Sequence, residues 1–224
     1  MADDCPLETV FRMQMNRLAE AGPAFFVQVG ANDGVYDDPI RPYVLQHGWP
    51  GLLIEPLPDM FAQLTGNYAD QPQLRFENCA IGPAGSLPIY RMPVGIGAPS
   101  AWYHGLASFR REVIASHAPL LKNLDRMIVE ETVRCVPFMD LMAQHGIRTM
   151  DILLTDTEGY DLEVLRQVDF TALTPKVVYT EIRHLSPADL AAMRDLLTGH
   201  DYEVYTFPGR PNLVAAHIPW LDSL

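Results

Sequence analysis

Short, continuous apolar runs alternate along this chain with longer stretches in which apolar residues recur at every third or fourth position. A short run bounded by glycine or proline is typical of a strand buried on both faces, whereas the recurring pattern is typical of an amphipathic helix. The runs predict strands at residues 25–29, 51–54, 74–81, 85–92, 127–136, 151–155, 176–181, 202–206 and 212–216. The recurring pattern predicts helices at residues 7–21, 39–47, 58–68, 137–145, 161–167 and 187–198, the last with Ser186 as its N-cap.

The order of these elements indicates the fold class. Strands and helices alternate over most of the chain, which predicts a doubly wound, Rossmann-like α/β domain. The last two runs predict a C-terminal antiparallel hairpin. Residues 93–123 lack periodicity and exceed the usual connection of ~4–6 residues, so they predict an insertion that borders the active site. We expect one domain over residues 1–224, with an N-terminal helix within residues 1–22.

The composition of the chain indicates its cellular compartment and excludes some classes of partner. No apolar run approaches the ~20 residues needed to cross a bilayer, and Asp3 and Asp4 stand where a secretory signal carries positive charge. Cys5, Cys79 and Cys135 are isolated, which favours a reducing compartment over a disulfide framework. These features predict a cytoplasmic protein without membrane association. The net charge of -12 argues against nucleic acid as a partner, because it would repel a phosphate backbone.

Candidate ligand-binding residues follow the predicted strands, because ligands of an open parallel sheet lie beyond the carboxyl ends of its strands. This rule selects residues 30–34, Glu55, residues 78–81 and residues 156–159. Gly30 lets the backbone approach a ligand closely, and Glu55 can accept hydrogen bonds from both hydroxyls of a ribose. Their separation of 25 residues suits a nucleoside cofactor.

The spacing of the glycines discriminates between cofactors. A dinucleotide site needs G-x-G-x-x-G to seat a pyrophosphate, whereas Gly30 and Gly34 form G-x-x-x-G. Asn32 and Asp33 lie between them, and the negative charge of Asp33 would repel a pyrophosphate. A cofactor with a ribose and an ammonium group but no phosphate fits better than NAD.

Four blocks of sequence resemble the FkbM family of methyltransferases, and the resemblance extends from about Phe25 to Ala216. The blocks are Val-Gly-Ala-Asn-Asp-Gly at 29–34, Glu-Pro-Leu-Pro at 55–58, Asn-Cys-Ala-Ile at 78–81 and Asp-Thr-Glu-Gly-Tyr-Asp at 156–161. The resemblance implies a class I methyltransferase fold, with a mostly parallel seven-stranded sheet, and S-adenosylmethionine as cofactor. It also implies that Glu55 binds the ribose.

The resemblance assigns the remaining cofactor contacts to the same blocks. It implies that Gly30, Asn32 and Gly34 line the methionine side, and that the segment containing Asn78, Ala80 and Ile81 flanks the adenine. Gln28 stands where many family members carry an acidic residue. Asp33 and Asp156 are therefore the candidates for contact with the amino group of the cofactor.

Methyl transfer to an oxygen is an in-line displacement, which a base or a metal assists when the hydroxyl is poorly acidic. The candidates for the base are His184, Asp156, Glu158 and Glu181, of which the histidine has the pKa best suited to neutral pH. The three carboxylates are an alternative set of ligands for Mg²⁺, although no metal is expected. In a purely structural alternative, Glu158 stabilises the start of the next helix.

In the insertion, Trp102, His104 and Ser108 are the candidates for substrate contact. The resulting hypothesis is methylation of a hydroxyl on a small metabolite, such as a sugar or a polyketide, and a homodimer is the assembly considered. The acceptor class comes from the family resemblance alone. An NAD-dependent oxidoreductase and a non-catalytic nucleoside-binding module are the alternatives.

Overall fold

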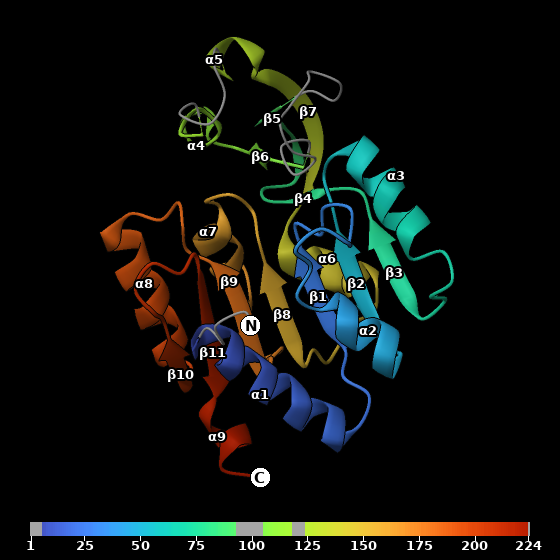
Figure 1. The fold of residues 1–224 in the computed structure, drawn as a ribbon, viewed down its shortest axis with the longest axis vertical. Helices are drawn as coiled ribbons and strands as arrows, with labels where there is room; N and C mark the ends of the chain where they lie inside the picture. Colours follow the sequence, from blue (N-terminus) through green and yellow to red (C-terminus); the bar gives the residue numbers. More distant parts are fainter. Residues whose placement is uncertain (1–5, 93–104, 118–123, 224) are drawn as a thin grey trace, which may run out of the picture.

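The computed structural model describes residues 6–92, 105–117 and 124–223, and it consists of a helix-covered main sheet with a smaller sheet above one end (Figure 1). The main sheet contains β1 Phe26–Val29, β2 Gly51–Ile54, β3 Leu74–Glu77, β8 Ile152–Thr155, β9 Val177–Glu181, β10 Tyr202–Tyr205 and β11 Asn212–His217. The principal helices are α1 Pro6–Ala21, α2 Arg41–His47, α3 Pro58–Asn67, α6 Phe138–Gln144, α7 Asp161–Leu165 and α8 Pro187–Thr198. The chain ends in the short helix α9 Ile218–Leu221.

The main sheet has the strand order β10-β11-β9-β8-β1-β2-β3. Strands β9, β8, β1, β2 and β3 pair in parallel, whereas β11 is antiparallel to both of its neighbours. This arrangement confirms the predicted mostly parallel sheet with a C-terminal antiparallel hairpin. Strand order reverses between β1 and β8. The strands β2 and β3, which follow β1 in the sequence, lie on one side of this point, and β9, which follows β8, lies on the other. Such a switch point is where open α/β sheets bind ligands.

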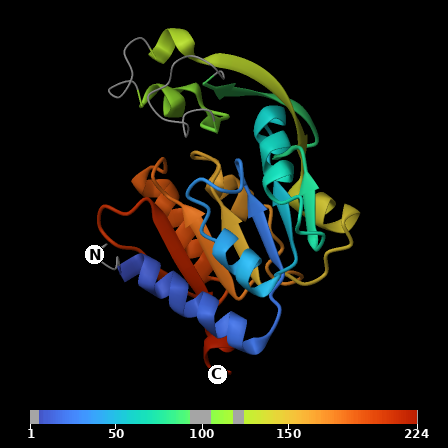
Figure 2. The same cartoon turned by 45° about the vertical axis from the view of Figure 1, so that its right-hand side comes forward.

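Successive side chains of each strand point to opposite faces of the main sheet, and they form two hydrophobic layers. Phe26 and Leu53 face the helices α1, α2 and α3, and Val27 and Leu52 face α6, α7 and α8. Both faces are therefore covered, which explains why these strands appear in the sequence as continuous apolar runs rather than as alternating ones. Figure 2 shows α1 and α2 lying across one of these faces.

The smaller sheet has the order β4-β7-β5-β6. Its strands are β4 Ala80–Ile81, β5 Gly85–Arg91, β6 Ala107–Ser108 and β7 Val129–Val136, with the short helices α4 Arg111–Ala115 and α5 Leu124–Met127 beside it. The inserted region is therefore larger than predicted, because it includes the strands on both sides of residues 93–123. In Figure 1 this sheet lies above the carboxyl ends of β1, β2 and β8.

The single strand predicted at residues 74–81 is wrong. Asn78 interrupts it by donating hydrogen bonds from its side-chain amide to the backbone carbonyls of Glu55 and Pro56, at 2.8 and 3.1 Å. The chain consequently leaves the main sheet after Glu77, and Ala80 begins a strand of the smaller sheet.

Other sequence predictions agree with the described structure. Ser186 caps α8, with its hydroxyl accepting the N–H of Asp189 at 3.1 Å. Cys79 and Cys135 are buried free thiols. Within the described residues, no helix has the length and hydrophobicity required to cross a membrane.

Candidate functional site

A cavity of about 900 Å³ lies at the switch between β1 and β8 and is bounded by residues of both sheets. Its size falls within the ~300–1,000 Å³ of most small-molecule sites. It is lined by the loop after β1, by Glu55 after β2, by Cys79 to Ile81, and by Asp156 to Glu158 after β8. These are the four segments that the strand-end rule selected from the sequence.

Gly30 begins the loop after β1 in a left-handed conformation, with φ of +80°. A Cβ atom at this position would lie 1.9 Å from the backbone oxygen of Asp156. Only glycine therefore allows the ends of β1 and β8 to approach so closely. Asn32 follows with φ of +49°, and its side chain lies against Gly105, in the turn that precedes β6 of the smaller sheet.

Glu55 is 4% exposed and lines the cavity at the end of β2. One carboxylate oxygen accepts the backbone N–H of Asn32 at 2.8 Å, and the other accepts that of Leu57 at 2.9 Å. Burial raises the pKa of Glu55 to about 7, although these two hydrogen bonds act in the opposite direction.

Three residues predicted for the cofactor site do not line the cavity. Asp33 turns its carboxylate to the backbone N–H groups of Val35 and Tyr36, at 2.9 and 2.8 Å. Gly34 packs against the ring of Tyr68, and Asn78 bonds the carbonyl of Glu55. Asp33, Gly34 and Asn78 therefore shape the loops around the cavity, whereas Gly30, Asn32, Glu55, Ala80, Ile81 and Asp156 line it.

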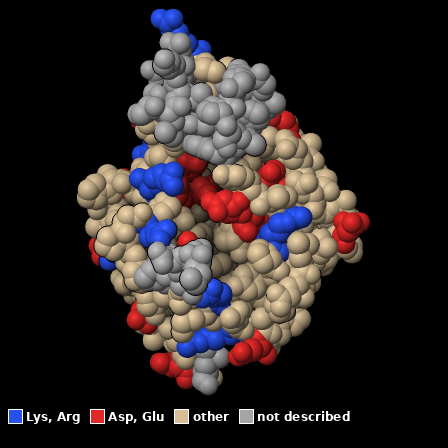
Figure 3. Space-filling view, in the orientation of Figure 1, with Lys and Arg blue, Asp and Glu red and all other residues tan. Residues whose placement is uncertain are grey.

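The cavity is strongly acidic, and Figure 3 shows acidic side chains gathered in the hollow at the centre of this face. Of the residues that the structure describes, seven carboxylates and two guanidinium groups line it: Glu8, Asp37, Asp38, Glu55, Asp156, Glu158 and Glu181, with Arg183 and Arg210. The sequence interpretation missed Asp37 and Asp38, although they follow the glycine loop directly. Gln28 donates to Asp38 at 3.4 Å, so a carboxylate does lie beside this atypical position.

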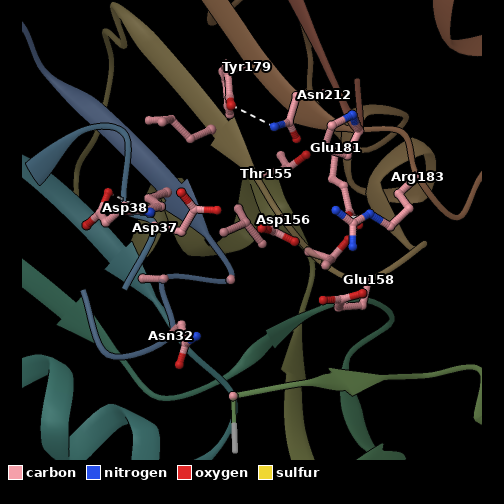
Figure 4. A pocket seen from close by; sticks show the side chains of 18 of the residues that line it. Asn32, Asp37, Asp38, Thr155, Asp156, Glu158, Tyr179, Glu181, Arg183 and Asn212 are labelled. Atoms are coloured by element: carbon pink, nitrogen blue, oxygen red, sulfur yellow. Dashed lines mark hydrogen bonds and ion pairs between the residues drawn. The ribbon is translucent and has the colours of Figure 1, made fainter. Parts of the chain in front are cut away.

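Asp156, Glu158 and Glu181 meet at one wall, where one oxygen of each lies within 4.8 Å of the others. In Figure 4, Asp156 lies between Asp37 on one side and Glu158 and Glu181 on the other. The walls of the cavity shield Asp156 from bulk water although its side chain is exposed to the cavity, and this loss of hydration, with the charge of Glu158, raises its pKa. Burial raises the pKa of Glu181, and the charges of Asp156 and Glu158 raise it further.

The loop that carries Asp156 and Glu158 is organised by Asp161. This fully buried carboxylate accepts hydrogen bonds from the hydroxyl of Thr155 at 2.7 Å and from the backbone N–H of Thr157 at 3.2 Å. Burial raises the pKa of Asp161 to about 6. Glu158 is held in a left-handed conformation with φ of +51°, which is costly for a residue with a side chain.

The remaining predicted residues lie at the border of the site. His184 does not line the cavity, but its Nε2 is 3.0 Å from a carboxylate oxygen of Glu158. Ser108 also lies outside the lining, because its hydroxyl donates to the backbone carbonyl of Glu158 at 2.8 Å. Trp102 and His104 lie outside the described residues.

Comparisons with known proteins identify the family. A family model described as the methyltransferase FkbM domain matches residues 28–204. Methyltransferase FkbM from Methylobacillus flagellatus KT aligns with a TM-score of 0.55 and 13% identity over 87% of this chain and 44% of that one. The METTL16 MTase domain aligns with a TM-score of 0.50 and 11% identity over 95% of this chain and 68% of that one. No curated protein sequence matches the chain.

At these identities the solved structures establish the fold alone, which is of the class I methyltransferase type. The chain spans less than half of the Methylobacillus protein.

Proposed function

This chain belongs to the methyltransferase FkbM domain family, and from that premise we propose that it transfers the methyl group of S-adenosylmethionine to a hydroxyl oxygen of a small metabolite. The observation that carries the proposal is the acidic cavity at the switch point, with Glu55 at the end of β2. A sugar or a polyketide is the acceptor class that we propose.

The charge of the cavity supports S-adenosylmethionine over NAD. The former carries a sulfonium and an ammonium group, which the ionised carboxylates of the cavity attract, whereas the latter carries two phosphates, which they repel. Gly30 and Asn32 are proposed to hold the methionine portion, because their loop lies beside the carboxylates. Ala80 and Ile81 are proposed to flank the adenine, and they supply an apolar wall.

Glu55 is proposed to bind the ribose. Each of its oxygens accepts one backbone N–H, and a carboxylate offers about four acceptor positions in all. Capacity therefore remains for the two ribose hydroxyls.

Asp156 is proposed to accept the proton of the acceptor hydroxyl. Its side chain is exposed to the cavity, and its raised pKa brings it closer to the range of an effective base at neutral pH. His184 is proposed to position Glu158 rather than to contact the acceptor, because its Nε2 lies 3.0 Å from a carboxylate oxygen of Glu158 and its side chain does not line the cavity.

A small acceptor is favoured because the cavity is bounded by the smaller sheet as well as by the main one. Leu106, Ala107 and Phe109, in and beside β6 of the smaller sheet, line it together with Gly30 and Asn32 of the loop after β1. We accordingly treat residues 1–224 as one functional domain. The same carboxylates disfavour a polyphosphate acceptor.

Calorimetry with S-adenosylmethionine, S-adenosylhomocysteine and NAD tests the cofactor. We expect the adenosyl ligands to bind and NAD to fail, and we expect Glu55→Ala to weaken binding by ~1.5–3 kcal/mol, about 10- to 150-fold. Glu163→Ala, a change outside the cavity lining, is the matched control. Circular dichroism establishes whether each variant is folded.

Transfer of a labelled methyl group to a panel of sugars, polyketides and other alcohols tests the chemistry. A labelled methyl group found on an oxygen atom of an acceptor supports the proposal. Adenosyl binding without turnover on any acceptor would support the non-catalytic module instead, and preference for NAD would support the oxidoreductase.

A further inference from the structure

Two histidines and a glutamate converge at the edge of the cavity from three separate parts of the chain. His117 follows α4 of the smaller sheet, Glu158 lies in the loop after β8, and His184 follows β9. One ring nitrogen of each histidine and one carboxylate oxygen of Glu158 lie within 4.8 Å of one another. All three side chains are largely buried, and His117 and Glu158 line the cavity.

The contact between Glu158 and His184 does not have the geometry of a hydrogen bond. The carboxylate Oε2 and the imidazole Nε2 are 3.0 Å apart, yet the two buried atoms are not aligned as acceptor and donor, and neither has a hydrogen-bond partner among the described residues. Two ligands of one ion, each ~2.1 Å from it, lie about 3.0 Å apart at the right angle of octahedral coordination and about 3.4 Å apart at the tetrahedral angle of most zinc sites. The observed 3.0 Å equals the octahedral separation and is about 0.4 Å shorter than the tetrahedral one.

A hydrogen bond to the backbone orients the imidazole of His117 as a metal ligand. The Nδ1 atom of His117 lies 3.2 Å from the backbone carbonyl oxygen of Val113, which can only accept a hydrogen bond. In the neutral ring this contact favours the tautomer with the proton on Nδ1, which leaves Nε2 as the nitrogen with the lone pair. A hydrogen bond from the second ring nitrogen to a backbone carbonyl is the usual support of a histidine that binds a metal.

The smaller sheet holds the other two side chains in place. Ser108 donates from its hydroxyl to the backbone carbonyl of Glu158, and Arg110 donates from its guanidinium to that of His184, each at 2.8 Å. The imidazole rings of His117 and His184 have centroids 5.5 Å apart, inclined at 59°. One segment, residues 108–117, therefore contains His117 and also holds the backbone of Glu158 and His184.

We propose that His117, Glu158 and His184 bind a divalent first-row transition-metal ion, with Zn²⁺ as the representative of the class. Two imidazoles and one carboxylate favour such an ion over Mg²⁺, which prefers oxygen ligands. Three protein ligands leave at least one coordination position open, as in catalytic zinc sites. Because His117 and Glu158 line the cavity, an ion held by them would be accessible from it.

The role of the ion rests on the proposed function. An ion at this wall would lie beside Asp156 and would polarise the oxygen of the acceptor, which lowers the pKa of its hydroxyl. The proton of the hydroxyl would pass to Asp156, and the oxygen would attack the methyl carbon as the carbon–sulfur bond breaks and S-adenosylhomocysteine leaves.

Metal binding by the full chain, stripped with a chelator, tests the site directly. We expect calorimetry to detect about one Zn²⁺ per chain, and we expect Co²⁺ to produce visible d–d absorption. His117→Ala, His184→Ala and Glu158→Gln should each weaken Zn²⁺ binding at least ~100-fold. His47→Ala, a change of an exposed histidine on α2, should leave the affinity unchanged. Circular dichroism and thermal unfolding confirm that each variant folds.

Three results would overturn the proposal. The first is a folded wild-type chain that binds neither Zn²⁺ nor Co²⁺. The second is Zn²⁺ affinity that survives both histidine substitutions. The third is binding that Asp156→Asn abolishes while the histidine variants retain it, since this would place the ion on the carboxylates. Metal binding without adenosyl binding would leave the site intact and refute only the proposed function.

Discussion

The carboxylate of Glu55 holds the backbone of Asn32, 23 residues earlier in the chain, through a hydrogen bond of 2.8 Å. Its second oxygen accepts the N–H of Leu57 at 2.9 Å. The residue proposed to bind the ribose therefore also fixes the loop proposed to hold the methionine portion. A substitution of Glu55 changes both the ligand contact and the shape of its neighbour.

Glu55→Gln should destabilise the protein without removing volume. The amide nitrogen of glutamine cannot accept a hydrogen bond, so the N–H of either Asn32 or Leu57 loses its partner. At about pH 6, where the wild-type carboxyl is largely protonated, we expect a loss of about 1–3 kcal/mol in urea unfolding. Glu163→Gln should stay within about 0.5 kcal/mol of wild type. Equal stability of the two variants would contradict the role of Glu55 in the loop.

The stability of the ligand-free protein should fall as the pH rises from about 4 to about 7. The pKa of Glu55 is raised from 4.5 to about 7 and that of Asp161 from 3.8 to about 6, so both groups hold their protons more tightly when folded. The stabilisation is complete below the unfolded values and is lost as the pH passes the folded ones. Asp59, whose pKa is lowered by Arg91, titrates below this window. Urea unfolding across the range measures the effect, and stability that rises with pH would refute it.

Gly30→Ala should disrupt the junction of β1 and β8. The new methyl group would lie 1.9 Å from the backbone oxygen of Asp156, and alanine disfavours φ of +80°. We expect a loss of at least about 2 kcal/mol, together with loss of adenosyl binding. Gly66→Ala is the matched control, because the position is in α3 and has no atom within 4 Å. That change should stabilise the helix by about 0.5–1 kcal/mol.

Arg91→Met should separate the smaller sheet from α3. The guanidinium of Arg91, 5% exposed, contacts both oxygens of Asp59 at 2.6 and 2.8 Å and also reaches Glu131 at 3.3 Å. We expect a loss of about 2–4 kcal/mol, less than for a fully buried pair because Asp59 is 34% exposed. Arg166→Met removes an exposed pair with Glu163 and should cost under about 1 kcal/mol. Similar losses in the two variants would exclude a special role for Arg91.

The sequence by itself determined the elements whose signals are local. The apolar run at Gly51–Ile54 and the helix Pro187–Thr198 with its Ser186 cap lie where the pattern predicted them. The loop after the first strand could also be predicted, because the spacing of Gly30 and Gly34 is a property of a turn of a few residues. Burial on both faces and capping act between near neighbours, so they leave a pattern in the chain.

Only the tertiary structure decided which distant residues meet. The strand predicted at 74–81 divides because Asn78 bonds the carbonyl of Glu55, a contact across 23 residues that no periodicity records. The reversal of strand order and the folding back of the smaller sheet bring His117 to Glu158 and His184. Such contacts depend on the packing of whole layers, whereas the pattern of a sequence reflects only the surroundings of each short segment.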